Sequence, residues 1–101
     1  MALYVAVHTY KKDPAEFSAF FTARAMYYAR TMAAGQSAAR CLKTWDPSGQ
    51  GRLDYLFCLW DADKPEDVQK TLQDFGLLEY LTADIMQVAE TDWAQLAQSG
   101  S

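Results

Sequence analysis

The chain has 101 residues, half of them hydrophobic, and its nine basic and thirteen acidic residues give a formal net charge of −4. This length suits one domain, and the acidic balance without a basic cluster argues against nucleic-acid binding. No apolar run reaches the roughly 18 residues of a membrane span, and two cysteines are too few for a disulfide scaffold, so we expect a cytoplasmic protein with reduced thiols.

The first third of the chain predicts a strand followed by a long helix. Residues 3–10 (LYVAVHTY) are rich in β-branched and aromatic side chains and are apolar on both faces, which is typical of a central strand. Asp13, Pro14 and Glu16 then follow the order of an N-cap, a first-turn proline and a first-turn acid. The helix is expected to continue to about Ala34, because Gly35 can adopt the left-handed conformation that ends helices.

The rest of the chain predicts a hairpin, a second helix and a last strand. Residues 39–46 and 53–60 flank a six-residue loop with two glycines, so they are expected to pair as a hairpin. Between Pro65 and Gly76, apolar residues recur at helical spacing. Residues 82–90 are expected to form the last strand.

This order, βαββαβ, predicts an α+β fold of the ferredoxin-like class. Such a fold has a four-stranded antiparallel sheet with both helices on one face and the first and third strands at the centre. We assign residues 1–98 to a single domain and residues 99–101 to a disordered tail. Trp93 and Leu96, near the end of the chain, are expected to be docking residues.

Side-chain alternation divides the sheet residues into two faces. If Asp46 pairs with Leu53, then Cys41 lies directly opposite Cys58. The helix side is assigned to Leu3, Val5 and Val7 of the first strand and to Arg40, Leu42, Thr44, Tyr55, Phe57 and Leu59 of the hairpin. The second face then carries Tyr4, His8, Tyr10, Cys41, Trp45, Leu56, Cys58 and Trp60.

The second face is too apolar to remain open to water, and the chain has no further predicted helix to cover it. A second copy of the chain is the simplest cover, so we expect a homodimer that packs sheet on sheet. The βαββαβ order, the opening strand LYVAVHTY and the aromatic face of LDYLFCLW resemble the dimeric α/β-barrel superfamily.

The resemblance implies a range of activities. The superfamily includes cofactor-free and haem-handling monooxygenases, isomerases, small metal-binding proteins and members without known activity. Its haem-degrading members use a helical histidine with supporting Asn and Trp residues, whereas this chain has no Asn, and its one histidine, His8, is on a strand. Haem degradation is therefore not expected, and no cofactor is predicted.

His8 is the natural candidate for a general acid or base, because its ordinary pKa lies near neutrality. Its predicted face also carries Cys41 and Cys58, which leaves open a nucleophilic Cys–His pair, a disulfide under oxidation and a metal site. No CxxC or HxxxH spacing supports the metal site. The structural alternative is a histidine hydrogen-bonded within a dimer interface, with both thiols in the core.

A second candidate site lies between the first helix and the sheet. Arg24 falls near the centre of an aromatic helix face, where a buried guanidinium would need an acceptor. Arg40 and the hydroxyls of Tyr28 and Tyr55 are expected to border the same space, so the four could bind a carboxylate or phosphate. Alternatively, Arg24 extends to the edge of the helix or pairs with an internal acid.

Two functional classes follow from these features. The first is a homodimeric module that binds a small anionic or hydrophobic ligand or a partner. The alternative is a cofactor-independent monooxygenase or isomerase that uses His8 or the arginine cleft. A deep apolar pocket that contains His8 or Arg24 would favour the enzyme, whereas a filled core would favour the module.

Overall fold

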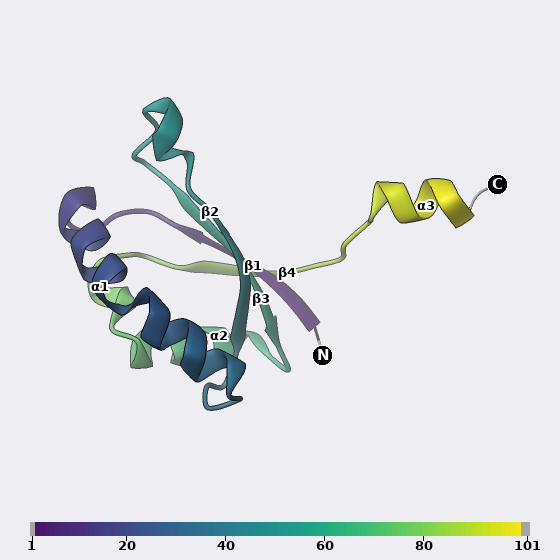
Figure 1. Ribbon diagram of the computed structural model, residues 1–101, viewed down its shortest axis with the longest axis horizontal. Coiled ribbons are helices and arrows are strands. Elements are labelled where there is room, and N and C mark those ends of the chain that lie inside the picture. The colour runs from purple at the N-terminus through teal and green to yellow at the C-terminus, as the bar shows by residue number, and fades with distance from the viewer. Residues whose placement is uncertain (1, 100–101) are drawn as a thin grey trace.

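A computed structural model of the protein describes residues 2–99 (Figure 1). The predicted order of strands and helices is confirmed, with two short 3₁₀ turns and one further helix added. The elements are β1 (Ala2–His8), α1 (Pro14–Ala33), β2 (Arg40–Trp45), η1 (Pro47–Gln50), β3 (Leu56–Ala62), α2 (Pro65–Asp74), η2 (Leu77–Glu79), β4 (Asp84–Val88) and α3 (Trp93–Ser99).

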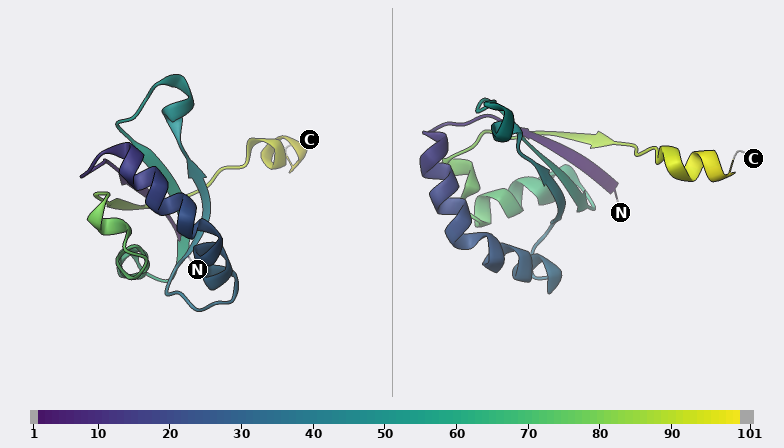
Figure 2. Two further views of the ribbon diagram at one scale, coloured as in Figure 1. Left: turned by 60° about the vertical axis from the view of Figure 1, so that its left-hand side comes forward. Right: turned by 45° about the horizontal axis from the view of Figure 1, so that its top comes forward.

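The four strands form one antiparallel sheet in the order β2-β3-β1-β4, so β1 and β3 are central as expected. Helices α1 and α2 both lie on one face of this sheet, and its other face is uncovered (Figure 2). The fold is therefore the predicted α+β arrangement. No helix within residues 2–99 is long and apolar enough to cross a membrane.

The predicted ends of α1 are confirmed by their local geometry. The Asp13 carboxylate accepts a hydrogen bond of 2.8 Å from the Ala15 backbone N–H, and Pro14 occupies the first turn, where no N–H is needed. Gly35 follows the helix with φ of 71°, in the left-handed region that favours glycine. The buried residues of α1 are Phe17 and Tyr28, so an aromatic face of the helix points inward.

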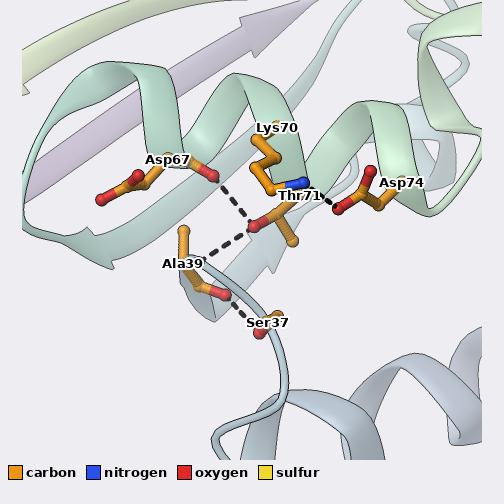
Figure 3. Close-up of polar contacts among 6 residues, drawn as sticks. All are labelled: Ser37, Ala39, Asp67, Lys70, Thr71 and Asp74. Carbon is orange, nitrogen blue, oxygen red and sulfur yellow. Dashed lines mark hydrogen bonds and ion pairs between the residues drawn. The ribbon is translucent and has the colours of Figure 1, made fainter.

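Thr71 ties the loop after α1 to α2 (Figure 3). Its Oγ1 donates to the Asp67 carbonyl at 2.9 Å and accepts from the Ala39 backbone N–H at 2.9 Å. Thr71 and Ala39 are both buried. One side chain therefore satisfies a buried backbone donor and fixes the start of β2 against α2.

The expected assignment of the two faces was wrong. Helices α1 and α2 cover the side that contains Tyr4, Ala6 and His8, which are buried, whereas Leu3, Val5 and Val7 are only partly buried. Both faces are apolar, so alternation shows which residues share a face but not which face the helices cover. Small residues at the centre of the covered face, such as Ala6, leave room for the large rings of α1 in the same core.

The uncovered side of the sheet, which we call the open face, is mostly apolar. Directly opposite partners share a face, and Val5 lies opposite Leu59 on one side and Met86 on the other. The apolar residues of the open face are Leu3, Val5, Val7, Trp45, Phe57, Leu59, Met86 and Val88. Of the eight residues expected on the uncovered side, Trp45 alone lies there.

The hairpin register also differs from the expected one. Cys41 pairs with Trp60 and Thr44 pairs with Cys58, so the two cysteines are diagonal rather than opposite. The pairing shifts between Cys41 and Lys43, which makes Leu42 the extra residue of a β-bulge. Because a bulge reverses the alternation, Cys41 and Thr44 both face the helices.

The C-terminal helix α3 extends away from the sheet instead of packing on it (Figures 1 and 2). Trp93 is 76% exposed and Leu96 is 50% exposed, so neither docks on its own chain. The radius of gyration is 14.8 Å, above the roughly 13 Å expected of a compact domain of this length. Ser99 ends this helix, and the rest of the expected tail, residues 100–101, lies outside the described residues.

Candidate active site

A cavity of about 230 Å³ lies between the covered face of the sheet and helices α1 and α2. It opens between α1 and β2, where the lining residues Ala29, Leu42 and Thr44 are exposed. Its wall is mainly aromatic and aliphatic, with few polar side chains, as is typical of sites for small organic molecules. The polar or titratable side chains that line it are His8, Tyr28, Cys41, Lys43, Thr44, Cys58 and Trp60.

His8 lies at the end of β1 and is fully buried at the edge of the cavity. Its Nδ1 is 2.8 Å from the Thr82 carbonyl oxygen, which can only accept, so Nδ1 carries the proton. Nε2 is then the unprotonated nitrogen, and it has no hydrogen-bond partner within residues 2–99. Burial lowers the pKa of His8, although the Thr82 bond partly opposes this, so the ring is neutral at pH 7.

Thr82 is itself fixed by Thr9, the residue that follows His8. The Thr82 hydroxyl accepts from the Thr9 backbone N–H at 2.9 Å, and the two hydroxyls are 2.6 Å apart. The Thr82 backbone N–H donates to the Thr9 carbonyl at 2.9 Å. These contacts position the carbonyl that selects the His8 tautomer.

The cavity wall holds a second buried polar group without a partner in the described residues. The indole Nε1 of Trp60, on β3, makes no hydrogen bond in the part of the chain that the structure describes. The register places Trp60 opposite Tyr4 and His8 opposite Leu56, so the two polar groups stand four residues apart along the strands. This is about 13 Å between backbone positions. His8 and Trp60 both line the cavity, and each has a buried polar atom without a partner among residues 2–99.

Tyr28 lines the cavity, as its predicted place between helix and sheet requires. Its ring stacks on Phe75 with centroids 4.2 Å apart, and its hydroxyl donates to the Phe75 carbonyl. Burial raises the pKa of Tyr28. Because its hydroxyl is already engaged, Tyr28 forms part of the wall and joins α1 to the end of α2.

The other residues of the predicted anion site do not meet. Arg24 is exposed on α1, with its guanidinium 4.0 Å from the centroid of the Phe20 ring. Arg40 forms an ion pair of 3.2 Å with Asp61, and Tyr55 is exposed and stacks on Phe57. The expectation that Arg24 is buried was wrong, because its long side chain reaches the helix edge, and the alternative that it extends outward is confirmed.

Sequence reasoning found His8 and Tyr28 but missed Trp60, Thr82 and Thr44 as parts of the site. Trp60 was expected on the same face as His8, but no role was assigned to it. No sequence signal marks Thr82, because its contact with His8 joins positions that are far apart in the chain. The helix-side position expected for Thr44 is confirmed, but the bulge at Leu42 places Cys41 on that side as well.

The sequence matches no protein-family model and no curated protein. The fold, however, is shared with solved structures of a small oxygenase. One is SnoaB from Streptomyces nogalater, a cofactor-independent oxygenase, with a TM-score of 0.52 and 14% identity over 90% of this chain and 93% of that one. A mutant of SnoaB matches over the same shares with a TM-score of 0.50 and 14% identity. At this identity the likeness establishes the fold alone.

Proposed function

We propose that the protein is a homodimeric, cofactor-independent oxygenase of the dimeric α/β-barrel type that acts on a small, largely hydrophobic molecule. The observation that carries this proposal is His8, a neutral imidazole with a fixed tautomer and a free Nε2 at an apolar cavity. The fold shared with SnoaB, a cofactor-independent oxygenase, supports the same class. The two free thiols fit a reducing compartment such as the cytoplasm.

The cavity favours an enzyme over a simple interaction module. A filled core would have left His8 as a structural group, whereas here an opening between α1 and β2 leads to an apolar space that His8 borders. Buried polar atoms normally have partners, because an unsatisfied one destabilises the fold by roughly 1–3 kcal/mol. Two such atoms at one cavity are what a ligand with matching polar groups would satisfy.

The substrate would be an elongated molecule with a polar group toward each end. His8 Nε2 can accept a proton from a methylene next to a carbonyl, and the enolate that results is electron-rich enough to react with O2. Oxidation of the methylene to a carbonyl by O2 releases one water, so the reaction balances without another reductant. Trp60 would bind the distal end of the substrate by donating its indole N–H.

The open face supports the homodimer. Eight apolar residues lie on it, and an apolar surface of this kind on a small chain is commonly an interface. Two copies related by a two-fold axis would bury both faces in one contact. The cavity lies on the other side of the sheet, so the expected interface leaves its opening free.

Proton abstraction can be tested apart from oxygenation. The protein would be incubated in D2O under nitrogen with cyclic ketones such as 2-tetralone, in which a neighbouring aromatic ring makes the methylene next to the carbonyl more acidic. NMR would follow the exchange of the methylene protons for deuterium. We expect exchange with the wild-type protein and a decrease of about 10²-fold or more in His8→Gln. Trp60→Phe, which keeps the base, should exchange 2-tetralone at close to the wild-type rate, because this ketone has no second polar group for the indole N–H to bind.

Circular dichroism of each variant would establish that it folds. If the wild-type protein exchanges no ketone of the panel faster than His8→Gln does, the assignment of His8 as a base is wrong. If the protein exchanges the methylene protons but takes up no O2 when air is admitted, it is not an oxygenase. That result would instead favour an isomerase, which uses the same base without the oxidation step.

A further inference from the structure

Three side chains that can share protons meet in the wall of the cavity: Cys41 and Thr44 from β2, and Cys58 from β3. The Thr44 Oγ1 lies 3.6 Å from Cys41 Sγ and 3.3 Å from Cys58 Sγ. One hydroxyl can therefore accept from the Cys58 thiol and donate to the Cys41 sulfur. The bulge at Leu42 is the reason that both β2 residues face the same way, and bulges often occur next to functional sites.

The two sulfurs of this cluster differ in environment. Cys58 is buried on the central strand β3, whereas Cys41 is partly exposed on the edge strand β2, close to the opening of the cavity. A hydrogen bond from Cys58 lowers the pKa of Cys41, burial opposes this, and a hydrogen bond from Thr44 adds to the lowering. The hydrogen bond between the two cysteines therefore favours the thiolate form of Cys41. The same interaction raises the pKa of Cys58, so Cys58 keeps its proton.

We propose that Cys41 is a hydroperoxide-reactive thiol and that Cys58 resolves its oxidised form to an intramolecular disulfide. An accessible thiolate beside a second thiol that can resolve its oxidised form is the arrangement that such a two-step oxidation needs. The proposal does not rest on the enzymatic function above, since it requires only the cluster and access to it.

The chemistry balances with one hydroperoxide per disulfide. The Cys41 thiolate attacks the terminal peroxide oxygen, the O–O bond breaks, and the leaving alkoxide or hydroxide takes a proton to leave as an alcohol or water. Cys58 then attacks the sulfur of the Cys41 sulfenic acid, an S–S bond forms, and the hydroxyl leaves as water with the Cys58 proton. Two molecules of an external thiol restore both cysteines.

Closing the disulfide requires β2 to move. Cys41 and Cys58 are diagonal neighbours, whose Cα atoms are usually about 7–8 Å apart, whereas a disulfide needs less than about 7 Å. β2 is an edge strand, and its bulge can adjust without disturbing the central strands. The same movement would alter the cavity wall beside the opening, so oxidation would change access to the cavity.

Intact-mass spectrometry of the reduced full chain after treatment with hydrogen peroxide at neutral pH tests the proposal. The wild-type chain should lose about 2 Da and regain it with dithiothreitol. Cys58→Ser should instead gain about 16 Da as a sulfenic acid that dimedone traps. Cys41→Ser should react at least about tenfold more slowly than wild type.

Several results would overturn the proposal. One is an equal rate of reaction with hydrogen peroxide for Cys41→Ser and wild type. The others are a disulfide that joins two chains, and a wild-type chain that accumulates sulfinic acid without forming a disulfide.

Thr44 is a positioning residue in this scheme, and the pH profile of the reaction tests it. Thr44→Val removes the bridging hydroxyl and keeps the shape, so the pH at which Cys41 reaches half its maximal rate should rise. The matched control is Thr22→Val, which changes an exposed threonine of α1 and should leave the profile unchanged. An unchanged profile in Thr44→Val would show that the hydroxyl does not activate Cys41.

Discussion

At the scale of single residues, His8 couples the cavity to the stability of the fold. Its imidazole is fully buried, and burial lowers its folded pKa below the value of about 6.5 that it has when exposed. As the pH falls through this value, the unfolded chain takes up a proton that the folded chain does not. The free energy of unfolding therefore decreases below about pH 6.5.

Replacement of His8 by Gln should remove this part of the pH dependence. We expect the difference in unfolding free energy between pH 8 and pH 5.5, measured by urea denaturation, to be smaller in His8→Gln than in wild type. Carboxylates titrate in both proteins and so cancel in the comparison. A variant with the same pH dependence as wild type would mean that the folded chain protonates His8 as easily as the unfolded one.

At the scale of elements, the α1–β2 loop and α2 depend on Thr71. Thr71→Val keeps the side-chain shape and leaves the buried Ala39 N–H without its acceptor. We expect a loss of about 1–3 kcal/mol in the free energy of unfolding. The control is Lys70→Ala, at the position next to Thr71, which removes an exposed ion pair with Asp74. It should change the free energy of unfolding by less than about 0.5 kcal/mol.

Chemical denaturation of both variants measures this contrast. Equal losses would indicate that the hydrogen bond to Ala39 does not determine the effect. A loss confined to Thr71→Val would identify this contact as the one that fixes the start of β2 beside the cavity opening.

The elements also show where sequence reasoning succeeds and where it stops. Asp13 and Gly35 mark the ends of α1 through contacts within a few residues, so local patterns were sufficient there. The bulge at Leu42 arises from pairing between strands, and no local pattern distinguishes a bulged register from a regular one. A regular register therefore put Cys41 and Thr44 on different faces, whereas the bulge brings them to the same one.

At the scale of the whole molecule, the face assignment shows a second limit. Alternation grouped Tyr4 and His8 correctly, yet with two apolar faces it could not decide which one the helices cover. A second copy is expected on either choice, since either face would be too apolar to leave in water. The expected interface is therefore formed by the residues of the open face.

Val5 lies near the middle of the open face, opposite Leu59 and Met86 on the neighbouring strands. Val5→Lys would place a charge at the centre of the expected dimer, where it would be buried without a partner. Light scattering should give a dimer for wild type and a monomer for this variant, and Tyr27→Lys, at an exposed position of α1, should remain dimeric. A wild-type monomer at micromolar concentration would contradict the sheet-to-sheet dimer. In that case the open face and the exposed Trp93 of α3 would be candidate surfaces for binding another protein.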